Sequence, residues 1–237
     1  MKGIFITGTD TDVGKTIIAS GIVNLLDSNK VKVGIMKPFA CSEKRYSKKY
    51  KTKDVKILIE SIKNNTEKID EQLVNPVFYN LPTAPYLAAK ILKKEIVDIK
   101  KVIKKYEKIS KNHEFTIVEG IGGIMVPLTK NKTVIDMIKE MNLSVIVVTT
   151  NKIGTINHTI LTIQMCKKYS IPVYGIIINN IERNNDPKID NALPQILQEM
   201  TGEKIVANIP FISNLTSNKI KKILEKSIDI YKLIELK

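Results

Sequence analysis

The sequence is poor in the residues that build several classes of protein. It has only two cysteines, Cys41 and Cys166, which lie far apart and have no histidine cluster near them. This pattern argues against a disulfide framework and against a zinc site, and it fits a reducing cytoplasm. No apolar run approaches the roughly 18 residues of a membrane span, and residues 1–7 are too short a run for a secretory signal. We therefore expect a soluble, cytoplasmic protein with no membrane partner.

Arginine is also scarce, although the chain is strongly basic. Lysine and arginine number 38 against 24 acidic residues, a net charge of +14, yet only Arg45 and Arg183 are arginines. A basic surface attracts nucleic acids, but readers of bases and phosphates rely heavily on the arginine fork. The lysines are scattered in doublets over helix-like segments, which is typical of solvated helix faces. We expect no nucleic-acid partner.

The chain lacks a glycine-, serine- or proline-rich linker, an internal repeat and a low-complexity segment. Short β-branched runs alternate with amphipathic stretches, which predicts a three-layer, doubly wound α/β fold: a mostly parallel sheet with helices on both faces. We expect one domain over residues 1–237. The predicted strands are residues 3–7, 32–37, 115–119, 144–149, 173–178 and 204–208. The predicted helices are residues 15–27, 54–63, 83–93, 97–111, 133–141, 156–169, 188–200 and 217–226.

Two segments do not fit this alternation. Residues 40–53 are polar and rich in lysine and directly follow a predicted strand. Ligands bind at the loops after the carboxyl ends of parallel strands, so we expect an active-site loop there. Residues 74–85 contain three prolines, which predicts a rigid extended connection into the next helix.

The strongest chemical signal is the run Gly8-Thr-Asp-Thr-Asp-Val-Gly-Lys-Thr16, which follows the first predicted strand and opens a helix. In that setting backbone amides and a helix N-terminus face an anion, Lys15 reaches the β- and γ-phosphates and Thr16 meets Mg²⁺. Five residues separate Gly8 from Gly14, one more than in the common phosphate-binding pattern.

Three further residues are candidates for the same chemistry. Glu119 ends an apolar strand and is followed by glycines, the arrangement that sets a carboxylate beside Mg²⁺ and backbone beside phosphate. Lys37 ends another strand, where it would stabilise phosphoryl charge or hold a carboxylate or carbamate; an ordinary strand-end lysine is the alternative. Asp54 opens a helix, as an N-cap, a metal ligand or both.

Together these motifs resemble the dethiobiotin synthetase family. The resemblance rests on the order and spacing of the loop, Lys37-Pro38, Val118-Glu-Gly-Ile-Gly-Gly123 and Gly154-Thr-Ile-Asn-His158, and it extends to at least Pro210. The longer loop spacing is the family's own form. The resemblance implies a P-loop NTPase fold, ATP and Mg²⁺ as cofactors, and closure of the ureido ring of dethiobiotin from 7,8-diaminononanoate and CO₂ in biotin biosynthesis. The reaction would pass through a carbamate and a carbamic-phosphoric anhydride.

The resemblance also implies a role for each matching position. Thr11, Lys15 and Lys37 would be catalytic, with Lys37 stabilising the carbamate. Asn179 would contact the adenine edge and residues 210–212 would form a wall of the base pocket. Mg²⁺ would be held by Thr16, Asp54 and Glu119. The residues implied in ATP binding are Asp12, Val13, Gly14, Lys15, Thr16, Ile17, Asp54, Glu119, Gly120, Ile121, Gly122, Asn179, Pro210, Phe211, Ile212 and Asn214.

The family is a homodimer with its substrate site at the subunit interface, and the same assembly is implied here. The residues implied in contact with the diamine are Thr11, Lys37, Cys41, Gly154, Thr155 and Asn157. The last three lie at a predicted helix start, where free amides suit the substrate carboxylate. Cys41 departs from the family, which commonly has serine there, and a thiol is a weaker hydrogen-bond donor. We interpret His158 as a packing residue rather than a general base.

Rival functions remain beside this one. An ATPase switch of the partitioning or division-site type shares the fold, but it carries a lysine five residues before the invariant lysine, where this chain has Asp10. A GTP switch would need Asn-Lys-x-Asp, and Asn151-Lys-Ile-Gly154 lacks the aspartate. A nucleic-acid-binding module stays open from charge alone, and it would bind duplexes with a steep salt dependence.

Overall fold

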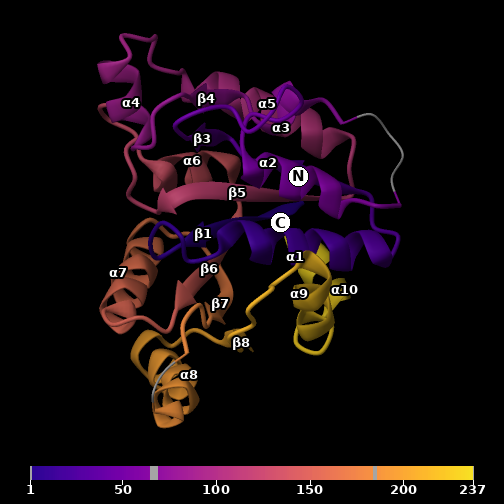
Figure 1. The fold of residues 1–237 in the computed structure, drawn as a ribbon, viewed down its shortest axis with the longest axis vertical. Coiled ribbons are helices and arrows are strands. Elements are labelled where there is room, and N and C mark those ends of the chain that lie inside the picture. Colours follow the sequence, from indigo (N-terminus) through magenta and orange to yellow (C-terminus); the bar gives the residue numbers. More distant parts are fainter. Residues whose placement is uncertain (1, 65–68, 184–185, 237) are drawn as a thin grey trace.

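The fold is built around a parallel sheet of six strands in the order β2-β5-β1-β6-β7-β8 (Figure 1). The structure is a computed structural model that describes residues 2–64, 69–183 and 186–236. The strands are β1 (Gly3–Gly8), β2 (Val33–Met36), β5 (Phe115–Gly123), β6 (Ser144–Thr150), β7 (Val173–Asn179) and β8 (Ile205–Ile209). Each falls on one of the predicted strands, and the prediction of a mostly parallel sheet is confirmed.

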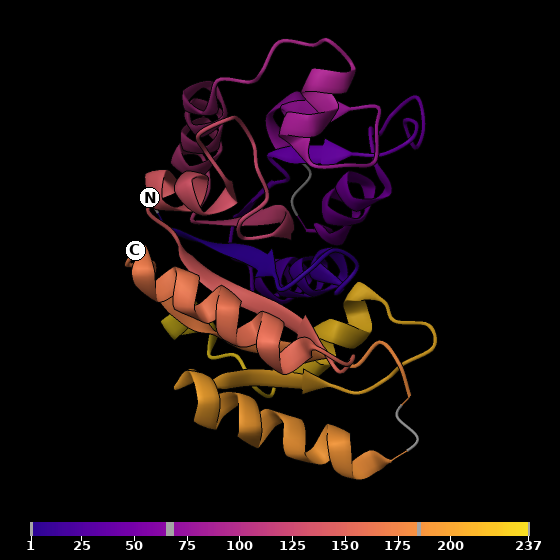
Figure 2. The same ribbon diagram turned by 90° about the vertical axis from the view of Figure 1, so that its left-hand side faces the viewer.

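Helices cover both faces of this sheet, as Figures 1 and 2 show. Alternate residues of β1 enter different cores: Ile4 and Ile6 belong to one apolar cluster and Phe5 to the other. This two-sided burial is why the strands are apolar almost throughout. The first cluster includes α1 (Lys15–Ser28), α2 (Lys53–Ser61), α9 (Ser217–Leu224) and α10 (Ile230–Ile234). The second includes α4 (Pro85–Ile91), α5 (Ile99–Lys111), α6 (Val134–Met141), α7 (Thr155–Lys168) and α8 (Pro187–Thr201). The three-layer α/β prediction is thereby confirmed.

Capping residues set several of the helix starts. The Asp98 side chain accepts a hydrogen bond from the Lys100 N–H at the start of α5. At α6, Thr133 and Asp136 form a capping box in which each side chain satisfies a backbone amide of the other. Such caps satisfy amides that lack a partner within the helix.

No helix in the described part of the chain is long and apolar enough to cross a membrane.

The two segments that did not fit the sequence pattern contain a second sheet. Strands β3 (Phe39–Cys41) and β4 (Val77–Tyr79) pair in parallel, and the short helix α3 (Glu71–Val74) precedes β4. Neither strand was among those predicted: β3 overlaps the start of the predicted active-site loop, residues 40–53, and β4 lies within the predicted extended connection, residues 74–85. Strands of three residues with partners far apart in sequence leave no local periodicity to detect. The small sheet lies beside α4 (Figure 1), and β3 also approaches β5 of the main sheet.

Candidate active site

The phosphate loop connects β1 to α1 at the carboxyl edge of the main sheet. Asp12 and Gly14 both have left-handed backbone, with φ of 58° and 91°, and α1 begins at the next residue, Lys15. A Cβ on Gly14 would lie 2.2 Å from Asn179 Nδ2, so only glycine fits there. Helix α1 thus presents its free N-terminal amides to the loop, as an anion site requires.

Lys15 lies across this loop. Its Nζ donates to the Asp10 carbonyl at 2.7 Å, and the side chain is 7% exposed. Burial, with a smaller contribution from the Lys37 ammonium, lowers the pKa of Lys15 to about 8. An incoming anion would offset both effects, because a negative charge favours the protonated amine. The loop and Lys15 therefore form a site prepared for phosphate.

Lys37, Glu119, Asp54 and Thr16 meet beside the loop, as their predicted roles require. Lys37 Nζ donates to Glu119 Oε1 at 2.5 Å and to the Gly120 carbonyl at 2.9 Å, and it lies 3.3 Å from Asp54 Oδ2. Thr16 Oγ1 donates to the same Glu119 oxygen at 2.7 Å. Lysine and glutamate are both almost completely buried. One ammonium thus contacts two carboxylates at the carboxyl end of the sheet, and the three groups together keep a net negative charge.

Burial and charge act in opposite directions on this pair. Burial disfavours the Lys37 ammonium, but Glu119 and Asp54 outweigh it and raise the pKa of Lys37. Burial also raises the pKa of Glu119, and the neighbouring Lys37 opposes that rise only in part. Glu119 Oε2 is buried and has no hydrogen-bond partner among the described residues. A buried carboxylate oxygen without a partner is costly, so it marks a position for a cation or a donor from a ligand.

The candidate metal ligands fit Mg²⁺ better than a structural metal that the protein alone would coordinate. They comprise two carboxylates, Asp54 and Glu119, and one hydroxyl, Thr16. Mg²⁺ is commonly held by one or two carboxylates, with water and phosphate oxygens as its other ligands. In residues 2–64, 69–183 and 186–236, no three His, Cys, Asp or Glu side chains gather as a metal cage. Asp54 itself is not the N-cap of α2: Thr52 Oγ1 accepts from the Val55 amide, and Asp54 is free to face the site.

These groups line a pocket of about 420 Å³ that runs from the phosphate loop to β3. Both ends of the predicted active-site segment, residues 40–42 and 52–53, contribute to its wall. The middle of that segment turns back on itself, with the Tyr46 amide donating to the Lys51 carbonyl at 2.9 Å. Residue-by-residue sequence analysis missed four members of the lining, although the polar loop pointed to them: Ala40, Ser42, Thr52 and Lys53.

Cys41 lies in the same lining, near Lys37. Burial raises the pKa of its thiol to about 11, and the Lys37 ammonium opposes this only weakly. The side chain is therefore a protonated thiol at neutral pH, with little nucleophilic character. A hydrogen bond from it to a ligand would be weaker than one from a hydroxyl.

A second, smaller pocket of about 130 Å³ separates the loop from the start of α7. Thr11 lines both this pocket and the one that holds Lys37, while Thr155 lines only the α7 side. Gly154 and Asn157 line a neighbouring open hollow of about 590 Å³. The six residues predicted to contact the diamine thus divide into two groups that Thr11 connects. His158 is exposed in the single chain and lines this pocket, and its interpretation as a packing residue stays a prediction.

The residues predicted to contact adenine lie on the other side of the loop. Asn179, at the end of β7, donates from Nδ2 to the Val13 carbonyl at 3.0 Å. Its buried Oδ1 has no hydrogen-bond partner in the described part of the chain. Phe211 follows β8 and is 37% exposed, with the Arg183 guanidinium 5.3 Å from the centre of its ring. Pro210, Ile212 and Asn214 follow β8 as well and are not among the residues that line the Lys37 pocket.

Comparisons with solved structures and with family models agree on the fold. A family model described as an AAA domain matches residues 2–219. The septum site-determining protein MinD from Pyrococcus horikoshii, solved with Mg-ADP, superposes with a TM-score of 0.57 at 16% identity, covering 98% of both chains. A ParA family ATPase from Chlorobium tepidum gives a TM-score of 0.51 at 13% identity, covering 100% of this chain and 97% of the other. At these identities the likeness concerns the fold alone.

Relatives found by sequence have a much higher identity to this chain than these solved structures do. An ATP-dependent dethiobiotin synthetase BioD from Nitrosopumilus maritimus is 43% identical over 99% of this chain and 100% of its own length. The protein of the same name from Bacillus subtilis is 34% identical, over 97% and 96% of the two chains. That from Thermodesulfovibrio yellowstonii is 36% identical, over 99% of both. With the phosphate loop, Lys37 and Glu119 gathered in one site and the similarity running over the whole length, the chain belongs to the dethiobiotin synthetase family.

Proposed function

We propose that this chain is an ATP-dependent cyclo-ligase that converts 7,8-diaminononanoate and CO₂ into dethiobiotin, with ADP and phosphate as the other products, in biotin biosynthesis. One observation supports this above all. A buried ammonium, Lys37, lies within 3.3 Å of two carboxylates, Glu119 and Asp54, next to a phosphate loop. A carbamate and a γ-phosphate both need positive charge at one point, which the ammonium groups of Lys37 and of Lys15 in the loop would supply, while bound Mg²⁺ would offset the two carboxylates.

ATP would lie along the loop, with the amides of residues 12–17 and the Lys15 ammonium on its phosphates. Thr16, Asp54 and Glu119 would hold Mg²⁺, which supplies charge neutralisation between the phosphate oxygens when it is bound. This assignment rests on the Thr16 hydroxyl, the two carboxylates and the unpaired Glu119 Oε2. We assign the adenine edge to Asn179 because its buried Oδ1 lacks a partner among the described residues and can accept from an amino group.

The chemistry requires positioning more than covalent catalysis. One amine of the diamine adds to CO₂ and loses a proton to give a carbamate, whose oxygen attacks the γ-phosphorus and displaces ADP. The second amine then attacks the carbonyl of the mixed anhydride, closes the ring and expels phosphate. Lys37 would stabilise the carbamate and the transferred phosphoryl group, while the loop holds the leaving ADP.

The diamine would extend from Lys37 past Thr11 toward the start of α7. Thr11 lines both pockets and so lies between the two groups of predicted substrate residues. We propose that Gly154, Thr155 and Asn157 bind the substrate carboxylate across the interface of a homodimer. The hollow next to them includes Ile153, which is fully exposed in the single chain and which a second copy would cover.

Two broader proposals accompany this function. The chain forms a single domain, since α1 near its beginning and α9 near its end pack into one apolar cluster. The use of ATP supports a location in the cytoplasm.

The decisive experiment measures ADP release with and without the diamine and bicarbonate. We expect release to require both and to match dethiobiotin formation one to one. Hydrolysis that ignores the diamine would contradict the proposal and favour an ATPase switch. Binding of duplex DNA with a steep salt dependence, without diamine-dependent ADP release, would favour a nucleic-acid-binding module.

A further inference from the structure

We infer that Asn75 is a positioning residue for Lys37: its side-chain amide holds the backbone that carries the catalytic ammonium. The inference rests on the proposed role of Lys37. Asn75 is completely buried, and its Nδ2 donates to the Lys37 carbonyl at 2.7 Å. On the other side of the same residue, the Lys37 amide donates to the Val74 carbonyl at 2.8 Å. Residues 74 and 75 therefore satisfy both backbone groups of Lys37.

Lys37 needs these hydrogen-bond partners because strand β2 ends just before it. The pairing of β2 with β5 stops at Met36, Pro38 has no amide hydrogen, and β3 begins at Phe39. Lys37 is nevertheless 3% exposed, so water cannot satisfy its backbone. An unpaired buried amide or carbonyl costs free energy comparable to a lost hydrogen bond. Asn75 and Val74 replace the missing sheet partner at this point.

The amide of Asn75 is used only at its donor end. Nδ2 donates to the carbonyls of Lys37 and Val77, the latter at 3.2 Å, while Oδ1 is buried with no partner in the described chain. Leaving an acceptor unpaired is unfavourable, so the two donated bonds are what this side chain provides. Because Val77 begins β4 and pairs with Phe39, one side chain ties the ends of β2 and of the second sheet together.

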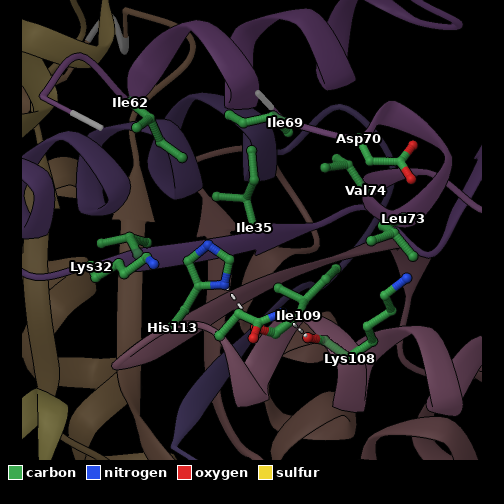
Figure 3. A pocket seen from close by; sticks show the side chains of 12 residues that line it. Lys32, Ile35, Ile62, Ile69, Asp70, Leu73, Val74, Lys108, Ile109 and His113 are labelled. Atoms are coloured by element: carbon green, nitrogen blue, oxygen red, sulfur yellow. Dashed lines mark hydrogen bonds between the residues drawn. The ribbon is translucent and has the colours of Figure 1, made fainter. Parts of the chain in front are cut away.

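Apolar packing alone does not fix the position of β2 relative to α3. A pocket of about 340 Å³ lies where β2 and α3 meet and leaves part of their contact open. Figure 3 shows Ile35 of β2 and Leu73 and Val74 of α3 among the side chains that line it. Where the pocket interrupts the packing, its walls lack the dispersion contacts that would fix their relative position. The hydrogen bonds at Lys37 therefore add to the remaining apolar contacts between β2 and α3 in aligning the two elements, and so help to set where the Lys37 ammonium lies.

The main test replaces Asn75 with leucine, which has a similar size and no donor. We expect turnover at saturating substrates to fall about tenfold to a hundredfold, since misplacing a catalytic group by about 1 Å has that effect. The Kd for ATP should stay within about twofold, because the phosphate loop does not depend on Asn75. The control is Ile35→Val, which loosens the same β2–α3 contact and leaves the hydrogen bonds to Lys37 intact; it should lower Tm and leave turnover unchanged.

A double-mutant cycle separates positioning from a general structural effect. If Asn75 acts through Lys37, then Asn75→Leu should cost nothing further in a Lys37→Ala background. Should Asn75→Leu fail to fold, Asn75→Ser, which keeps a single donor on a shorter side chain, replaces it in the same measurements. Turnover within twofold of wild type, an equal further loss in the Lys37→Ala background, or a parallel loss of ATP affinity would each overturn the inference. If the wild-type protein itself releases ADP without the diamine, the proposed function fails instead, before Asn75 is tested.

Discussion

The phosphate loop and the Lys37 segment belong to one site, but they are held in different ways. The loop is a run of consecutive residues whose shape comes from its own backbone, with left-handed conformations at Asp12 and Gly14. The Lys37 segment is held by Val74 and Asn75, which lie almost forty residues further along the chain. The first is therefore encoded locally, while the second exists only once the chain has folded.

This difference indicates which changes each half of the site should tolerate. A local loop fails when its own backbone is strained. A segment held from a distance fails when a remote donor is lost, even though its own sequence is intact.

The largest effect is expected from Lys37→Ala. Removing the ammonium should lower dethiobiotin formation by a hundredfold or more, which corresponds to about 2.7–4 kcal/mol of transition-state stabilisation by analogy with loss of an oxyanion donor. ATP binding, measured by calorimetry, should persist because the loop is intact. Lys56→Ala, which removes the same charge from the surface pair with Glu60 on α2, should be near wild type. Near-normal turnover in Lys37→Ala would contradict the proposed catalytic role of Lys37.

A comparably large effect is expected on the reactivity of Cys41. Its pKa of about 11 lies some two units above that of an ordinary thiol, so its thiolate at pH 8 should be about a hundredfold scarcer. Only the thiolate reacts with iodoacetamide, so alkylation should rise about tenfold per pH unit from pH 8 until pH approaches 11. Mass spectrometry of the labelled peptides measures this rate, with Cys166, whose pKa burial raises to about 12, as the slower comparison. Rapid labelling of Cys41 at pH 8 would show that the Lys37 segment opens in solution.

A moderate effect is expected from Gly14→Ala. Alanine at a φ of 91° costs about 1–2 kcal/mol, and its Cβ would press on Asn179. ATP affinity should therefore fall roughly fivefold to thirtyfold. The matched control is Gly123→Ala, where the nearest atom to a new Cβ is 3.6 Å away and the backbone needs no positive φ. Equal losses from the two substitutions would mean that loop geometry is not what binds the phosphates.

The smallest effect is expected from Ile35→Val beside the pocket in Figure 3. Ile35 is buried, and removing one methyl group there should lower the free energy of unfolding by about 0.5–1.5 kcal/mol. Urea denaturation measures this loss, and turnover should not change because no contact to Lys37 is lost. A fall in turnover larger than twofold would show that apolar packing, and not only hydrogen bonding, aligns the segment.

Much of the molecule follows from patterns within short windows of sequence. The six strands of the main sheet are apolar on both faces and appear as runs of valine and isoleucine, which is why their approximate positions were predictable. The phosphate loop and the strand-end Glu119 were recognisable for the same reason, because each depends on neighbours in the chain. The cap of α2 was misassigned because both Thr52 and Asp54 suit a helix start, and only the structure selects Thr52.

The three-layer fold and the phosphate loop are encoded in periodicity and motif spacing, which are local properties of the chain, and so are the residue types gathered in the candidate site. The pairing of β3 with β4, the position of Thr11 between two pockets and the attachment of Lys37 to Asn75 arise only in the folded chain. These depend on contacts between segments whose separation in sequence no periodic pattern records. They form because buried backbone groups must find partners wherever the folded chain brings donors and acceptors together.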